Sequence, residues 1–308
     1  MAFSEELKEK IEYTDSVLRT YMPKVEGFEK TVLSAMDYTV FAGGKRIRPI
    51  LMSEVYKLFG GNDKIVEPFM AAIEMIHTYS LIHDDLPALD NDDYRRGRKT
   101  AHVVYGEAMA ILAGDGLLNY AYETATKAFD MVAEGEDNEG VAHELLMRKR
   151  IEKALSILAS KPGVHGMIGG QTVDVEMTGQ RLSKEQLFYI YENKTGALIE
   201  ASMTIGAILA GANDDEVDVI RNAAYNIGMA FQIQDDILDE TATFEELGKP
   251  IHSDEESGKV TYVTIHGMEQ STAEVERLSN LALDDIKKVQ SEAGFVIELV
   301  KYLIHRTN

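Results

Sequence analysis

Two clusters of aspartates are the residues of this chain best suited to chemistry. The i, i+4 spacing of Asp235 and Asp239 stacks both carboxylates on one face of a helix, and Gln232 lies one turn earlier on that face. Like charges at this spacing repel each other, so a cation is expected between them. The clusters are Asp84, Asp85, Asp90, Asp92 and Asp93 in one stretch and Asp235, Asp236 and Asp239 in the other.

The donor atoms of these clusters indicate magnesium and a phosphorylated ligand. Carboxylates without a nearby histidine pair or cysteine suit a hard cation, and magnesium commonly binds through one or two carboxylates plus substrate phosphates. One such cluster in an acidic chain could equally be a solvated helix end, but two clusters, each after a long apolar helix, favour a site. A calcium-binding EF-hand at Asp90 is excluded, because Arg95 replaces its glycine and Ala101 its final glutamate.

Basic residues gather in two places, although the chain has only 31 of them against 52 acidic residues. Lysine and arginine can clamp a diphosphate without a metal, while glycines allow close backbone approach to a ligand. Surface cations that pair with nearby acids are the alternative. His77, before the first aspartates, could also be a core histidine. The basic groups are Lys45, Arg46 and Arg48 after Gly43-Gly44, and Arg95, Arg96, Arg98 and Lys99 after the first aspartates.

The elements that position these groups are predicted to be helices. The chain has only six prolines, and apolar residues recur at helical spacing between them. One long helix runs from Ile65 toward Pro87. Because an undistorted helix would place Asp90 about 240° around from Asp84, Pro87 has to distort the backbone if these aspartates converge.

Two further helix starts carry capping signals, and no stretch alternates long enough to predict a strand. Asn213 is a suitable N-cap for a helix that runs to Leu238, with Glu216 three residues on. Ser183 and Gln186 form a capping-box pattern. A single helical domain over residues 1–308 is the simplest architecture.

Composition excludes several classes of protein and site. The chain has no cysteine, so disulfides and thiolate sites are absent. A formal net charge of -21 makes nucleic acid an unsuitable partner. The acidic start does not resemble a signal peptide, which favours a cytoplasmic location. The apolar stretch 201–212 is too short to cross a bilayer of roughly 30 Å, so no transmembrane segment is expected.

Six motifs in order give the chain a resemblance to a known family. It resembles the trans-isoprenyl diphosphate synthases (polyprenyl synthetases), and most closely the bacterial farnesyl diphosphate synthases (geranyltranstransferases). The motifs are GGKRIRP at 43–49, HTYSLIHDDLPALDNDDYRRG at 77–97, GGQTVD at 169–174, KTG at 194–196, FQIQDDILD at 231–239 and LGKPIHSDEESGKVTY at 247–262.

The resemblance implies an all-α, single-domain isoprenoid synthase fold whose helices ring a central substrate cavity, and also a homodimer with three magnesium ions. Its metal ligands would be Asp84, Asp85, Asp90, Asp235, Asp236 and Asp239. Its ligands for the allylic diphosphate would be Arg95, Lys194, Lys249 and Lys259. The pocket for isopentenyl diphosphate would contain Lys45, Arg48, His77 and Arg96.

The reaction implied by the resemblance condenses isopentenyl diphosphate with dimethylallyl and geranyl diphosphates to give farnesyl diphosphate. Metal and cations favour ionisation to an allylic cation, which the double bond of isopentenyl diphosphate attacks. Thr195, Gln232 and the carbonyl of Lys194 would stabilise the positive carbon. Among these groups, Asp84, Asp85, Arg95, Lys194, Thr195, Gln232 and Asp235 are the predicted catalytic residues.

Product length should depend on the residues that block the growing tail on the helix before the first motif. Tyr79, about 7.5 Å up that helix from Asp84, predicts a C15 product, although it could simply pack a core and Ser80 leaves room beside it. His252 departs from the glycine usual in relatives, and no role is assigned to it or to Arg306.

Four other functions are weighed against this prediction. A geranylgeranyl or geranyl diphosphate synthase would differ only in pocket depth. A non-catalytic regulatory subunit would have lost metal ligands, and a terpene cyclase would lack the second aspartate motif. A metal-storage bundle needs several inward Glu-x-x-His pairs, whereas Glu74 and His77 offer one.

Overall fold

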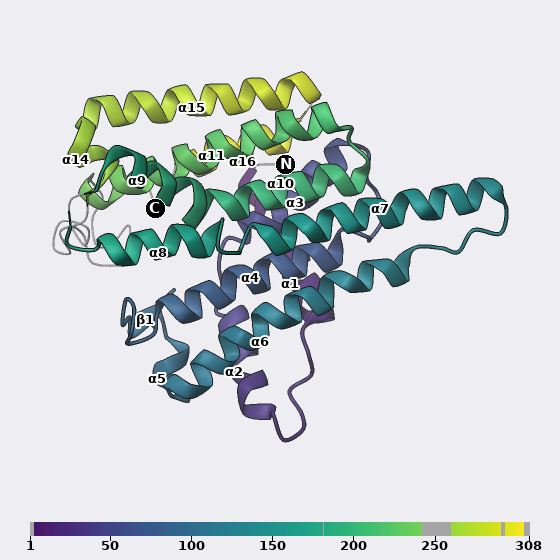
Figure 1. The fold of residues 1–308 in the computed structure, drawn as a ribbon, viewed down its shortest axis with the longest axis horizontal. Coiled ribbons are helices and arrows are strands. Elements are labelled where there is room, and N and C mark those ends of the chain that lie inside the picture. Colours follow the sequence, from purple (N-terminus) through teal and green to yellow (C-terminus); the bar gives the residue numbers. More distant parts are fainter. Residues whose placement is uncertain (1–2, 181, 242–259, 291–292, 305–308) are drawn as a thin grey trace. The chain divides into compact units, whose positions relative to one another are not determined.

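The structure is a computed structural model, and it describes residues 3–180, 182–241, 260–290 and 293–304. Within these ranges nearly all regular structure is helical, which confirms the predicted all-α class (Figure 1). The chain forms two compact units, Met1–Ser156 and Ile157–Asn308. The single domain over residues 1–308 stays a prediction.

The first unit is built around α4 (Glu67–Asp84), which is buried on nearly all sides and contacts the helices α1, α2, α3 and α6. A helix that is apolar all round belongs in a core, and Phe69, Ile73 and Ile76 have no exposed surface. The other elements are α1 (Phe3–Tyr21), α2 (Lys30–Val40), α3 (Ile47–Leu58), α5 (Ala101–Tyr105), α6 (Glu107–Thr126) and the 3₁₀ helix η1 (Lys127–Met131), while α7 (Asn138–Ser160) crosses into the second unit.

A short β-hairpin in the first unit was not predicted. Its strands β1 (Tyr94–Arg95) and β2 (Arg98–Lys99) pair antiparallel around Arg96 and Gly97, whose φ angles are 52° and 72°. Two positive φ angles are what a tight two-residue hairpin turn requires, and an arginine at the first of them gives no sequence signal for it. The hydroxyl of Tyr38 on α2 donates to the carbonyl of Lys99 at 2.8 Å and fixes the hairpin.

The second unit is built around α11 (Asp214–Thr241), which contacts α10 and α15 along its length. These three helices lie side by side in Figure 1. Between α9 and α10 the backbone makes six residues of π-helix, named η2 (Tyr191–Gly196). The remaining elements are α8 (Met167–Met177), α9 (Lys184–Ile190), α10 (Ala197–Ala210), α14 (Tyr262–His266), α15 (Met268–Val289) and α16 (Gly294–Ile304).

The predicted helix starts are confirmed. Asn213 and Glu216 cap α11 reciprocally, with backbone-to-side-chain hydrogen bonds of 2.8 and 3.0 Å. Ser183 and Gln186 form the capping box of α9. Among the described helices, none combines the length and the apolar character needed to cross a bilayer.

Candidate active site

The first aspartate motif lies where α4 ends and the chain turns back. α4 stops at Asp84, before Pro87, and the backbone N–H of Asp90 then donates to the carbonyl of Asp84 at 2.9 Å. This turn after α4 brings Asp90 back to Asp84, which an undistorted helix could not do. Asp84 is half-buried and Asp90 is exposed, whereas Asp85 is 3% exposed.

Arg95 on β1 grips the buried carboxylate of this motif. Its Nε and Nη2 atoms both lie 2.6 Å from Oδ1 of Asp85. Burial raises the pKa of Asp85, and Arg95 opposes that rise. The hairpin therefore has a clear role, because it carries a cation to the end of α4.

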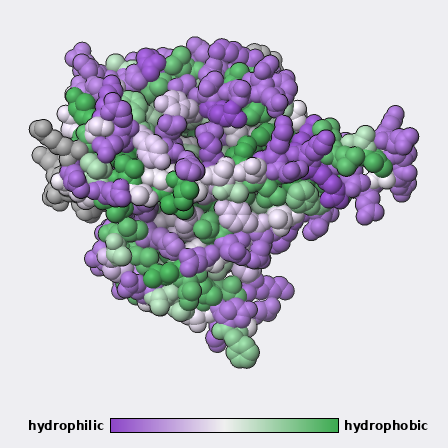
Figure 2. All heavy atoms as spheres, viewed as in Figure 1, coloured by the Kyte–Doolittle hydropathy of each residue, from purple (hydrophilic) through white to green (hydrophobic). Residues whose placement is uncertain are grey.

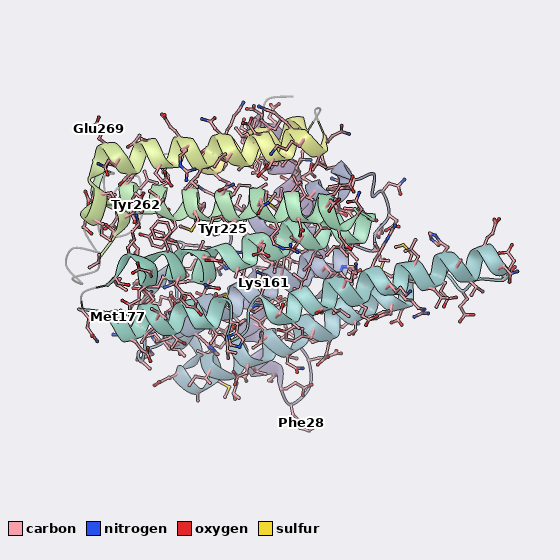
Figure 3. All side chains as sticks on the ribbon, turned by 45° about the horizontal axis from the view of Figure 1, so that its top comes forward. Phe28, Lys161, Met177, Tyr225, Tyr262 and Glu269 are labelled. Carbon is pink, nitrogen blue, oxygen red and sulfur yellow. The ribbon has the colours of Figure 1, made fainter. Side chains whose placement is uncertain are left out.

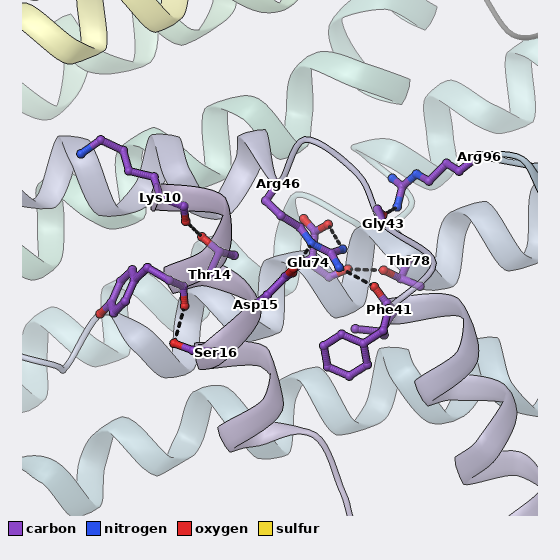
Figure 4. A network of polar contacts seen from close by, with 12 residues as sticks. Lys10, Thr14, Asp15, Ser16, Phe41, Gly43, Arg46, Glu74, Thr78 and Arg96 are labelled. Carbon is purple, nitrogen blue, oxygen red and sulfur yellow. Dashed lines mark hydrogen bonds and ion pairs between the residues drawn. The ribbon is translucent and has the colours of Figure 1, made fainter. Parts of the chain in front are cut away.

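Arg96 and the two glycines form a second contact within the first unit. The Arg96 guanidinium donates to the carbonyl of Gly43 (Figure 4). A Cβ atom on Gly44 would lie 2.6 Å from Nη1 of Arg96, and Gly44 has a φ of +133°. Gly44 thus leaves room for an arginine of the same chain, and the approach of a ligand to the two glycines stays a prediction.

Arg46 is a structural cation rather than a ligand-binding one. Its guanidinium lies 2.8 Å from Asp15 and 2.9 Å from Glu74 (Figure 4). It also donates to the carbonyl of Val40. Its side chain is 1% exposed. Such a buried network positions α1, α3 and α4 relative to one another, and it leaves Arg46 committed to carboxylates.

Arg48 and His77 lie in a strongly cationic part of the same unit. Nε of Arg48 is buried and has no hydrogen-bond partner among the described residues. Burial lowers the pKa of His77 well below 6.5, and the charges of Arg48, Arg96, Arg95 and Arg46 lower it further. Burial also lowers the pKa of Arg48, to about 10, so it keeps its charge at neutral pH. Lys45 is half-buried nearby in the sequence.

Tyr79 is buried in the core of the first unit. It is 5% exposed, its hydroxyl has no hydrogen-bond partner among the described residues, and its ring meets that of His83 edge to face at 5.7 Å. Burial raises its pKa to about 12, with further contributions from Tyr122 and Asp84. Ser80 is half-buried, and its hydroxyl donates to the carbonyl of His77.

The π-helix η2 presents Lys194 and Thr195 in the second unit. Nζ of Lys194 lies 2.6 Å from Oδ2 of Asp174, and the Thr195 hydroxyl donates to Oε1 of Gln232 at 3.0 Å. π-Helical turns are rare and are frequently found at functional sites. The residues of three predicted motifs, GGQTVD, KTG and FQIQDD, therefore meet at one place.

Two glycines allow this close packing around η2. A Cβ atom on Gly170 of α8 would lie 2.3 Å from the backbone nitrogen of Lys194, and one on Gly228 of α11 would lie 2.9 Å from Cα of Gly196. Neither distance is compatible with a side chain, so glycine is needed at both positions. A small pocket of about 80 Å³ opens there, lined by residues that include Asp174, Lys194, Gln232, Asp236 and Thr261.

The second aspartate motif lies near the end of α11. Asp235 is half-buried, whereas Asp236 and Asp239 are each 4% exposed. Oδ2 of Asp236 accepts a hydrogen bond from the Tyr191 hydroxyl and a second from the backbone N–H of Tyr262 at 2.8 Å.

Some site residues were missed, and some lie outside the described residues. Asp174 and Tyr191 were not predicted as site residues, although Asp174 is in a quoted motif. Asp174 precedes its partner Lys194 by 20 residues, so spacing alone could not reveal the pair. Lys249, Lys259, His252 and Arg306 are outside the described residues.

The donor set of the aspartates fits magnesium. Across the described ranges, no three histidine or carboxylate side chains are grouped to hold a metal ion. Magnesium does not need such a cage, because it usually takes one or two carboxylates and completes its coordination with water and substrate phosphates. The carboxylates of Asp84, Asp90, Asp235 and Asp239 offer only oxygen atoms as donors, as magnesium prefers.

Comparison with known proteins places the chain and its fold in one class, the helical prenyltransferases. The polyprenyl synthetase family model matches residues 29–299. The farnesyl diphosphate synthase of Geobacillus stearothermophilus is 43% identical over 83% of this chain and 82% of its own. The geranylgeranyl diphosphate synthase of Cyanophora paradoxa is 40% identical over 98% of this chain and 96% of its own.

A solved structure agrees in fold. The geranyltransferase of Helicobacter pylori, in complex with magnesium and isoprenyl diphosphate, has a TM-score of 0.79 and 30% identity over 99% of this chain and 97% of its own. The chain belongs to the polyprenyl synthetase family. It is a short-chain prenyltransferase, as the motifs predicted.

Proposed function

We propose that this prenyltransferase condenses isopentenyl diphosphate with dimethylallyl and then geranyl diphosphate, and that it releases farnesyl diphosphate. The observation that carries the C15 product is the buried ring of Tyr79, which lies on α4 five residues before Asp84. A tail that grows along α4 would meet that ring. The identity to the farnesyl diphosphate synthase of G. stearothermophilus supports the same product.

The basic residues are proposed to bind the two diphosphates. Arg48, His77 and Arg96 would hold isopentenyl diphosphate, because they lie in the cationic region where Nε of Arg48 is buried without a partner among the described residues. Lys45, three residues before Arg48, would add a further positive charge. Arginine suits this task because its planar fork donates two hydrogen bonds to a phosphate. Arg95 and Lys194, with Lys249 and Lys259, would hold the allylic diphosphate.

The six aspartates, Asp84, Asp85, Asp90, Asp235, Asp236 and Asp239, are proposed as the residues that hold magnesium, with three ions in the loaded enzyme. When bound, magnesium supplies positive charge that stabilises the departing diphosphate. The magnesium complex of the H. pylori geranyltransferase supports this cofactor. The aspartates thus orient the diphosphate while the basic side chains add charge to it.

Gln232 and Thr195 are proposed to face the allylic cation. The Thr195 hydroxyl donates to Oε1 of Gln232, so the two side chains orient each other beside Lys194. Oxygen dipoles fixed in advance stabilise a positive carbon without reorganising during the reaction. The double bond of isopentenyl diphosphate then forms the new carbon–carbon bond, and the released diphosphate accepts the proton that is lost. These steps need no covalent intermediate with the enzyme.

A homodimer is proposed as the assembly. Large apolar side chains are exposed on the first unit, and Figure 2 shows hydrophobic residues at the surface among hydrophilic ones. Exposed apolar side chains that gather on one surface often mark a protein interface. They include Val104 on α5, Ile111 and Leu112 on α6, and Leu145 and Leu146 on α7. The cytoplasmic location stays a prediction.

A geranylgeranyl diphosphate synthase is the second candidate function. The 40% identity to the C. paradoxa synthase favours it, and the two functions differ only in where elongation stops. The test is incubation with isopentenyl and dimethylallyl diphosphates, with and without magnesium, followed by analysis of product length. We expect C15 as the end product and no product without magnesium. C20 as the end product would replace the first proposal with the second.

A further inference from the structure

The hydroxyl of Tyr191 joins three elements of the second unit. Tyr191 begins η2, and its hydroxyl donates to Oδ2 of Asp236 on α11. The backbone N–H of Tyr262, the first residue of α14, reaches both oxygens, at 3.1 Å from the Tyr191 hydroxyl and 2.8 Å from Asp236. Tyr262 is labelled on its helix in Figure 3. One carboxylate oxygen is therefore shared by η2 and α14.

The contact of Tyr191, Asp236 and Tyr262 (the Tyr191 junction) is buried, so its hydrogen bonds contribute to the stability and orientation of these residues. Tyr191 and Asp236 are each 4% exposed, and Tyr262 is 7% exposed. A buried carboxylate that loses a hydrogen-bond donor is destabilised, because its charge has already lost most of its contact with bulk water. Asp236 is thus expected to turn, or α11 to move, if the Tyr191 hydroxyl is removed.

The same elements carry the groups proposed to act on the substrate. η2 presents Lys194 and Thr195, and α11 presents Asp235 directly before Asp236 and Gln232 one turn earlier. α8 and α11 pack so closely on η2 at Gly170 and Gly228 that a Cβ atom at either position would clash with the η2 backbone. A shift at the Tyr191 junction is therefore expected to move these side chains as well.

From these contacts we propose that Tyr191 is a positioning residue of the prenyltransferase reaction, which acts through Asp236. Its hydroxyl fixes the orientation of the second aspartate motif relative to Lys194 and Thr195, and so sets the affinity for magnesium and diphosphate. The inference rests on the proposed roles of these residues. It assigns a function to a tyrosine that the motifs did not single out.

The test compares Tyr191→Phe with Tyr225→Phe. The first variant keeps the ring and loses only the hydroxyl, while Tyr225 on α11 is 39% exposed and serves as the matched control (Figure 3). Calorimetry measures the Kd of inorganic pyrophosphate in the presence of magnesium. A partner that orients a metal ligand typically contributes about 10-fold to 100-fold in affinity, so Tyr191→Phe should weaken pyrophosphate binding by at least about 10-fold. Tyr225→Phe should bind like the parent.

A second measurement separates positioning from plain stability. A hydroxyl that only stabilises the fold would lower Tm equally with and without magnesium pyrophosphate and leave the Kd unchanged. A positioning hydroxyl reduces the rise in Tm that the ligand induces. Asp236→Asn alone does not isolate this contact, because Asp236 is also a proposed magnesium ligand, so it serves as the background in which Tyr191→Phe is measured again. In the double variant the losses in affinity should be smaller than the product of the two single losses, because both changes break one junction.

Two outcomes would overturn the inference. In the first, the parent condenses the substrates and the Kd of Tyr191→Phe for pyrophosphate stays within about twofold of the parent's Kd, far below the effect typical of a residue that orients a metal ligand. Tyr191 then has no positioning role, and the proposed function stands. If the parent neither binds pyrophosphate with magnesium nor forms product, the proposed function fails and the inference fails with it.

Discussion

Single side chains divide the aspartates of this chain into two kinds. In each Asp-Asp pair the first residue, Asp84 or Asp235, is half-buried, and the second, Asp85 or Asp236, is buried and held by a protein donor. A buried carboxylate needs such donors, whereas a half-buried one keeps access to ligands. Each pair therefore combines a half-buried carboxylate with a buried one whose orientation is fixed by a protein donor.

The product length is a prediction about one side chain, Tyr79. We expect Tyr79→Ala to extend the product beyond C15, because it removes a buried ring from α4 and leaves a cavity. Such a truncation costs about 3–5 kcal/mol of stability, so the variant should be assayed well below its Tm.

Tyr79→Phe is the control for that prediction. It removes a hydroxyl that has no hydrogen-bond partner among the described residues and keeps the ring. We expect it to yield C15 like the parent, as judged by chromatography of the dephosphorylated products. Only C15 from Tyr79→Ala would contradict the assignment.

His77 should make stability depend on pH. The pKa of His77 is lowered in the folded chain. At a pH between this lowered pKa and 6.5, His77 is therefore protonated in the unfolded chain but neutral in the folded one. The free energy of unfolding should therefore fall as the pH drops through 6.5. The decisive quantity is the difference in this free energy between the parent and His77→Asn at pH 7.5 and 5.5. The parent should lose stability relative to the variant on acidification, and parallel curves would rule out the effect.

The helices whose ends and faces depend on nearby residues could be predicted from the sequence. The apolar run toward Pro87 and the caps at Asn213 and Ser183 gave the helices α4, α11 and α9, because capping and helical spacing depend on residues within one or two turns. Aspartates on one helix face could be grouped for the same reason.

The elements that the sequence did not reveal are those fixed by distant contacts. The π-helix η2 lies against Gly170 and Gly228, residues 20 or more positions away from it. The hairpin is fixed by Tyr38, which is 61 residues from Lys99. The pairs Lys194–Asp174 and Tyr191–Asp236 likewise depend on how helices pack. No local pattern encodes such contacts.

The packing of α11 on η2 leads to a prediction about Gly228. A Cβ atom there would lie 2.9 Å from Cα of Gly196, so Gly228→Ala must separate the two elements. We expect a loss of about 1–3 kcal/mol in the free energy of unfolding, as for other overpacked sites. The KM for the allylic substrate should also rise, because the Thr195–Gln232 contact spans the same two elements.

Gly294 gives the matched control for that change. A Cβ atom on Gly294, at the start of α16, meets no atom of the described residues within 4 Å. Gly294→Ala should therefore leave stability and kinetics close to those of the parent, as measured by urea unfolding and steady-state assays. If Gly294→Ala and Gly228→Ala lowered stability and raised KM equally, the contact of α11 with η2 would not be the cause of these losses.

For the molecule as a whole, the charge of -21 dominates its response to salt. Like charges repel in the compact state, and the repulsion is screened as the Debye length falls from about 30 Å at 0.01 M to about 10 Å at 0.1 M salt. We therefore expect the Tm at pH 7 to rise with sodium chloride over this range. At a pH near the sequence pI of about 4.8 the net charge is close to zero, and the rise should vanish. A rise of equal size at both pH values would instead indicate a general effect of salt on apolar burial.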